Sequence, residues 1–146
     1  MAWAEKRALL SSDPNTKVGS VVLDFHRSLI GIGWNRFPSG IEENIRIMDR
    51  ELKNRLMIHA EVASLLHCQG LGRYLVVTFA PCDRCAGQII DHGVKEVVYK
   101  ENPGNDYERR WQNSVEFGFR LFQEAGVYVH AIGKKEPWLL GRPFPS

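Results

Sequence analysis

Two short segments of the chain hold residue types that bind metal ions. Residues 59–61 read His-Ala-Glu, and residues 81–85 read Pro-Cys-Asp-Arg-Cys. They offer one imidazole, two thiols and one further carboxylate. Imidazole nitrogen and thiolate sulfur are typical ligands of Zn²⁺ in tetrahedral sites, and a set of three protein ligands leaves the fourth position open for chemistry. The spacing predicts one catalytic zinc ion with three ligands: His59, Cys82 and Cys85.

Helix ends are expected to position these ligands. Cys82 and Cys85 are three residues apart, so both sulfurs point the same way at the start of a helix predicted over 83–92. A helix N-terminus favours the thiolate form that metal binding requires. His59 opens a second predicted helix, over 59–66. Two helix N-termini repel a cation, but two thiolates offset this effect and leave a neutral site with Zn²⁺.

Hydrophobic runs and breaker clusters outline the remaining elements. Residues 35–54 form a long loop with a turn or two of helix, and the tail from 133 is extended. Val62, Leu65 and Leu66 are expected to face the core. The strands after an initial hairpin alternate with helices, which predicts a single α/β domain over 1–146, a three-layer α/β/α fold with a five-stranded mixed sheet. The other predicted elements are helices over 2–10 and 107–125 and strands over 18–23, 29–34, 74–79, 94–99 and 127–132.

Composition narrows the functional classes. The net charge of +2 on 146 residues is too small to indicate a polyanion partner, so we do not expect nucleic-acid binding. The chain has no run of 18 apolar residues and no apolar core of a signal peptide, which predicts no membrane span. Three cysteines, an odd number, do not suggest a disulfide framework. We expect a cytoplasmic protein.

Other readings of the cysteine pair are possible. A redox C-x-x-C would leave His59 and Glu61 without a purpose. A closed structural zinc site would need His67 or Cys68 as its fourth ligand. Those residues lie about 12 Å along the helix that His59 begins, at roughly 1.5 Å per residue, which is too far to share the metal.

Glu61 is the candidate catalytic residue. It lies two residues from a predicted ligand, and a carboxylate beside a metal-activated water can take a proton and later deliver it to the substrate. The alternative is a glutamate that is simply favoured by the helix N-terminus. The neighbouring histidine and cysteines favour the catalytic role.

Several blocks of the sequence resemble one enzyme superfamily. The H-x-E and P-C-x-x-C patterns are the signature of zinc deaminases. The chain resembles the cytidine and deoxycytidylate deaminase superfamily, most closely the bacterial and phage deoxycytidylate (dCMP) deaminases. The zinc motif alone identifies only the superfamily. The blocks at 12–19 and 31–40 narrow the resemblance to the dCMP branch. The matching blocks are 12–19 (SDPNTKVG), 31–40 (GIGWNRFPSG), 59–62 (HAEV), 81–86 (PCDRCA), 89–98 (IIDHGVKEVV) and 121–127 (LFQEAGV).

The resemblance implies a reaction and a substrate pocket. Water adds to C4 of cytosine, Glu61 shuttles protons to N3 and to the amine, and ammonia leaves, converting dCMP to dUMP. It also implies a homo-oligomer, dimer or hexamer. Asn35 matches a pocket asparagine, although a turn residue is the alternative. Thr16 and Lys17 are candidates for the 5′-phosphate, with a turn and a solvated lysine as the alternative. Ala60, Phe79 and Pro81 complete the predicted substrate contacts, and Arg36 and Arg46 are weaker phosphate candidates.

One departure and two rival functions remain. Ala63 stands where many family members have asparagine, so a polar contact to the substrate is missing. A base deaminase acting on tRNA or single-stranded DNA shares the zinc motif, but polynucleotide binding should need many phosphate contacts and depend steeply on salt. A non-enzymatic zinc domain would tolerate replacement of Glu61.

Overall fold

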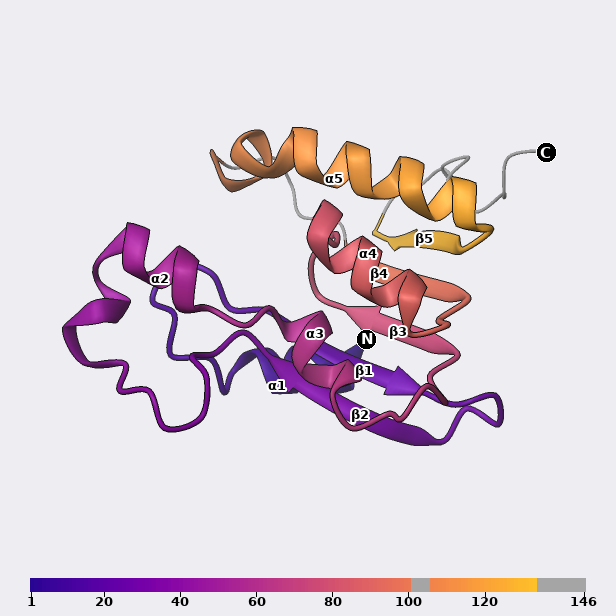
Figure 1. The fold of residues 1–146 in the computed structure, drawn as a ribbon, viewed down its shortest axis with the longest axis horizontal. Helices are drawn as coiled ribbons and strands as arrows, with labels where there is room; N and C mark the ends of the chain where they lie inside the picture. The colour runs from indigo at the N-terminus through magenta and orange to yellow at the C-terminus, as the bar shows by residue number, and fades with distance from the viewer. Residues whose placement is uncertain (101–105, 134–146) are drawn as a thin grey trace.

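A five-stranded mixed sheet is the centre of the fold. The computed structural model describes residues 1–100 and 106–133. The strands lie in the order β2 (Leu29–Trp34), β1 (Gly19–Leu23), β3 (Tyr74–Val77), β4 (Glu96–Lys100) and β5 (Tyr128–Ile132), as Figure 1 shows. β1 is antiparallel to both of its neighbours, whereas β3, β4 and β5 are parallel. The predicted hairpin and the predicted mixed sheet are confirmed.

One face of the sheet carries the first helix. α1 (Ala2–Ala8) packs on β1, where a side chain at Gly19 would overlap the backbone of Ala4 and Ala8. This close approach requires small residues, and Ala4 and Ala8 are the buried residues of the helix. The helix ends at Ala8, two residues before the predicted end.

The opposite face carries the helices that hold the predicted ligands. α3 (Ala60–Leu65) packs on β2, where side chains at Gly31 or Gly33 would overlap its backbone. α4 (Asp83–Asp91) packs beside α3, and α5 (Asp106–Ala125) lies along α4 (Figure 1). Helices therefore cover both faces, as the predicted α/β/α fold requires.

One expectation about helix 59–66 needs correction. Leu66 does not face the core, since it is 55% exposed, whereas Leu65 is buried and Val62 is partly buried and packs against the core, as predicted. The buried side is formed instead by small residues and Leu65, because the glycines of β2 bring the sheet backbone against the helix. The side chains fully buried in the sheet and its helices include Val22, Leu65, Leu75, Val77, Ile89, Val94, Val97 and Phe122.

The segment between β2 and α3 has more structure than a loop. It contains a 3₁₀ helix, η1 (Asn44–Ile47), and then α2 (Arg50–Leu56). Asp49 caps α2, since its carboxylate accepts hydrogen bonds from two backbone N–H groups of the first turn. η1 and α2 extend away from the sheet, on the left of Figure 1. The predicted extended tail, beyond residue 133, lies outside the described residues.

No helix in the described part of the chain is long and apolar enough to cross a membrane.

Candidate metal centre and active site

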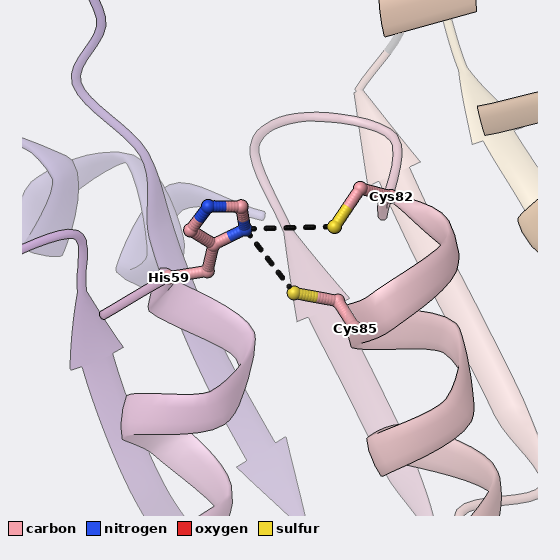
Figure 2. Close-up of side chains that lie close together, drawn as sticks. All are labelled: His59, Cys82 and Cys85. Atoms are coloured by element: carbon pink, nitrogen blue, oxygen red, sulfur yellow. Dashed lines mark hydrogen bonds between the residues drawn. The ribbon is translucent and has the colours of Figure 1, made fainter. Parts of the chain in front are cut away.

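The three predicted ligands come from the starts of two neighbouring helices. His59 is the N-cap residue of α3, Cys82 is the N-cap residue of α4, and Cys85 lies in the first turn of α4. A backbone bridge between Arg36 and Ile58 fixes the chain immediately before His59. Both cap residues have extended backbone, which turns their side chains toward the space between the two helix ends (Figure 2).

The donor atoms are already gathered. One ligand atom from each of the three residues lies within 4.8 Å of the others. Nδ1 of His59 is 3.6 Å from Sγ of Cys82 and 3.3 Å from Sγ of Cys85 (Figure 2). Zn–S and Zn–N bonds of about 2.3 and 2.0 Å allow one ion to reach all three donors of such a group. One nitrogen and two sulfurs are the donor set that zinc prefers, so the residues fit the predicted ion.

The two thiols have different acidities. Hydrogen bonds from Cys85 and from the His59 ring lower the pKa of the Cys82 thiol to about 4. The hydrogen bond to Cys82, together with burial, raises the pKa of the Cys85 thiol. A cation between the sulfurs would favour the thiolate form of both.

Glu61 lies buried in the first turn of α3, two residues after His59. Burial raises the pKa of its carboxyl from 4.5 to about 7, and the charge of the His59 ring opposes this rise. A carboxyl that titrates near neutral pH can both accept and donate a proton during a reaction. A metal ion at the neighbouring donors would lower this pKa, because an opposite charge favours the carboxylate.

The fourth ligand of a closed structural site is not in place. Cys68 is buried on the far end of the helix, where its thiol donates a hydrogen bond to the carbonyl of Ser64 at 3.1 Å. His67 is exposed. Among residues 1–100 and 106–133, the metal-binding group contains only the three predicted ligands.

Comparisons with known proteins give the family. Residues 1–101 match the family model described as the cytidine and deoxycytidylate deaminase zinc-binding region. The chain belongs to this deaminase family. The family and the zinc predicted from the sequence are therefore confirmed.

Two relatives and one solved structure with deaminase names are similar to this chain. It is 32% identical over 121 residues to an "uncharacterized deaminase in luxG 3′ region" of Aliivibrio fischeri, covering 82% of this chain and 81% of that protein. It is 30% identical over 136 residues to the deoxycytidylate deaminase of Homo sapiens, covering 87% and 74% respectively. The structure resembles a dCMP deaminase of the cyanophage S-TIM5 solved in complex with dCMP and dUMP. That match has a TM-score of 0.68 and 28% identity, covering 88% of this chain and 90% of the other.

Asn35 of the deaminase lies at the end of strand β2, where it braces another predicted segment. The side chain is buried, its Oδ1 accepts a hydrogen bond from the N–H of Val18, and its Nδ2 donates one to the carbonyl of Thr16, both at 2.8 Å. The structure thus brings Asn35 and the 16–18 segment together. The buried amide of Asn35 therefore holds the backbone of residues 16–18 in place, whereas a solvent-exposed turn residue would make no such long-range hydrogen bonds.

The candidate phosphate residues are accessible. Thr16 is half-buried and Lys17 is exposed, and Nζ of Lys17 donates a hydrogen bond to the carbonyl of Ser11. Arg36 donates a hydrogen bond to the carbonyl of Phe37, at 3.3 Å, and Arg46 is exposed. None of these four side chains has a carboxylate partner among the described residues.

The remaining predicted contacts flank the ligands. Ala60 and Pro81 are fully buried beside the predicted ligands. Phe79 is half-buried and lies on the loop between β3 and Cys82.

Two features near the site are not predicted from the sequence. Trp111 and Ser114 of α5 contact the ligand-bearing segments, although they lie more than 20 residues from them in the chain. Lys53 of α2 forms a buried ion pair with Asp13, with Nζ 3.2 Å from Oδ2. The cluster Ser-Ser-Asp-Pro-Asn indicates a turn at Asp13, but no local pattern distinguishes Lys53 from a solvated lysine.

Proposed function

We propose that this protein catalyses the hydrolytic deamination of dCMP to dUMP and ammonia. The observation that carries the proposal is the group of one imidazole and two thiols within 4.8 Å, with a buried carboxyl two residues from the histidine. Relatives named deoxycytidylate deaminase, and a similar structure that holds dCMP and dUMP, support this substrate.

Each residue of the site has a proposed task. His59, Cys82 and Cys85 would hold a zinc ion. When bound, this ion would act as a Lewis acid that lowers the pKa of water, so that hydroxide would be available as a nucleophile at neutral pH. Glu61 accepts a proton from the attacking water and delivers it to N3 of the cytosine. The hydroxyl group now on C4 gives its proton to the Glu61 carboxylate, which passes this second proton to the amino group. The C–N bond then breaks, ammonia leaves and the C4 carbonyl forms. The carboxyl of Glu61 is buried two residues from His59, beside the donor group, which places it to make both transfers.

The substrate's phosphate is proposed to bind beside Thr16 and Lys17. Lys17 is exposed and is tied only to the Ser11 carbonyl, so its ammonium can turn toward an anion with little cost. Asn35 holds the backbone of this segment in place from β2. A free nucleotide offers one phosphate group, which one ammonium and one hydroxyl can bind.

We also propose that the enzyme is a homo-oligomer, a dimer or a hexamer, in the cytoplasm. Several large apolar side chains are exposed on the described surface, including Phe25, Leu66 and Leu71, and such residues are candidates for contacts between copies. All three cysteines are unpaired and buried, as expected in a reducing compartment. Light scattering of the purified protein measures the mass of the assembly.

Ammonia release from a panel of substrates tests the reaction. The panel contains dCMP, CMP, deoxycytidine, dCTP and a tRNA. We expect turnover of dCMP well above the others, with shallow dependence on salt. Activity confined to the tRNA, with steep dependence on salt, would replace the proposal with a polynucleotide deaminase.

Glu61→Ala tests the catalytic carboxyl. We expect this variant to keep its zinc and to lose at least about a hundredfold in turnover. Glu51→Ala is the matched control, because Glu51 also lies in the first turn of a helix, α2, but its side chain is exposed to solvent. Near-normal turnover by Glu61→Ala would show that Glu61 serves only the helix N-terminus. Cys85→Ser should lose zinc, and normal zinc content in that variant would contradict the ligand set.

A further inference from the structure

One face of α5 reaches both helices that hold the metal ligands. Trp111 contacts the ring of His59, and Ser114 contacts Asp83, the residue after Cys82. Positions three apart lie on the same side of a helix, so the two contacts come from a single face of α5. The His59 side and the cysteine side of the site are thereby connected through a third helix.

Trp111 packs edge-to-face against the imidazole of His59. The two ring centroids are 6.1 Å apart and the planes are inclined by 80°, an edge-to-face arrangement that aromatic rings prefer. Nδ1 of the same imidazole faces both sulfurs. In zinc sites a hydrogen bond from the second ring nitrogen commonly orients the histidine. Here the indole of Trp111 packs beside the ring and can restrict its rotation.

The contact of Ser114 fixes the start of α4. The Ser114 hydroxyl accepts a hydrogen bond from the backbone N–H of Asp83, at 3.1 Å, and donates one to the Asp83 carboxylate, at 2.7 Å. The first N–H groups of a helix have no partner within the helix, so Ser114 satisfies one of them from outside. A Cβ at Gly118 would lie 3.3 Å from Cβ of Ala86 and 3.4 Å from Cα of Asp83, so α5 runs close to α4 at this point.

We propose that α5 is a clamp that positions the zinc ligands, with Trp111 as a positioning residue for His59 and Ser114 as one for Cys82. The proposal rests on the zinc site proposed above. In this proposal α5 holds the three donor atoms together before the metal binds, because this one helix contacts both ligand-bearing segments. Preorganised ligands bind a metal more tightly than ligands that must be ordered at binding.

Zinc affinity of Trp111 variants tests the clamp. Competition with a chromophoric chelator gives the affinity, and the visible absorption of the Co²⁺-substituted protein reports the geometry of the ligands independently of activity. We expect Trp111→Ala to lose about 10- to 100-fold in zinc affinity, the range typical for residues that orient metal ligands, and to alter the Co²⁺ spectrum. Trp111→Phe, which keeps an aromatic edge, should restore most of both.

Phe117→Ala is the matched control, because it removes an aromatic ring from α5 at a side chain that is 53% exposed. It should leave the affinity and the spectrum unchanged. Thermal unfolding of each metal-free variant separates a loss of folding from a loss of metal binding. Should Trp111→Ala not fold, Trp111→Leu and Ser114→Ala take its place.

The outcomes separate the clamp from the site itself. Folded Trp111 and Ser114 variants with wild-type zinc affinity and an unchanged Co²⁺ spectrum would overturn the clamp. A fall in affinity equal to that of Phe117→Ala would also overturn it. His59→Ala should abolish tight zinc binding, and wild-type affinity in that variant would overturn the zinc site on which the clamp depends.

Discussion

Replacing Glu61 with glutamine should remove a pH-dependent loss of stability from the metal-free protein. Glu61 is buried at the start of α3, and burial raises the pKa of its carboxyl from 4.5 to about 7 in the folded state. In the unfolded chain the carboxyl returns to its ordinary value. Between these two values the folded state binds more protons than the unfolded state, so the free energy of unfolding falls as the pH rises.

The size of the effect follows from the two pKa values. With 1.36 kcal/mol for each pH unit, a carboxyl that moves from 4.5 to about 7 lowers the free energy of unfolding by roughly 3 kcal/mol above pH 7. This loss of stability is absent below pH 4.5 and complete above pH 7. Between pH 5 and pH 8 the free energy of unfolding falls by about 2.5 kcal/mol from this cause.

Urea unfolding in the presence of a chelator, at pH 5 and at pH 8, measures this change. The glutamine has nearly the shape of glutamate but does not titrate, so any constant effect of the substitution cancels between the two pH values. Glu61→Gln should gain about 2.5 kcal/mol relative to wild type on going from pH 5 to pH 8. Glu51→Gln, at an exposed carboxylate, is the control and should show no such gain. An equal difference between Glu61→Gln and wild type at both pH values would refute the raised pKa.

Three other substitutions have defined outcomes. Lys53→Met leaves the buried carboxylate of Asp13 without its ammonium partner, so denaturant unfolding should show a loss of about 3 kcal/mol, and the double variant with Asp13→Asn should recover part of it. A destabilisation that is simply additive in the double variant would mean that the pair does not interact. Gly33→Ala would put a Cβ into the carbonyl oxygen of Ala60, so we expect a loss of at least about 2 kcal/mol and a lower Tm, and wild-type Tm would contradict the close packing of α3 on β2. Lys17→Ala should raise KM for dCMP far more than for deoxycytidine, and an equal change for both would exclude a phosphate contact.

The strands and the grouping of His59, Cys82 and Cys85 could be predicted because their signals are local. Cys82 and Cys85 are one helical turn apart, and His59 follows an apolar segment that the structure places against Arg36. The strands are runs of apolar residues that end at breakers, so β2 has the predicted bounds and the others differ by a few residues. Spacing and hydrophobicity are properties of the chain itself, and the fold preserves them.

The packing partners could not be predicted because they depend on the tertiary fold. Trp111 meets His59 only when α5 lies on α4, and Lys53 meets Asp13 across 40 residues of chain. The outward position of Leu66 was missed for a related reason. Glycines in β1 and β2 let the helix backbones approach the sheet closely, so alanine faces the core where a larger residue such as Leu66 was expected.

The same glycines bear on how the site is built. His59 and Glu61 belong to the first turn of α3, and this turn is pressed against β2 through Gly33, with Gly31 one helical turn further along. The Ser20 and Ser64 hydroxyls add a buried hydrogen bond of 2.9 Å between β1 and the same helix. A helix that touches the sheet backbone directly has little freedom to slide, because no flexible side chain lies between them. The imidazole and the carboxyl are therefore placed by backbone packing, and the sulfurs by α4. The relative position of the predicted ligands and of the carboxyl proposed as the acid–base group is thus set by the scaffold and not by a mobile loop.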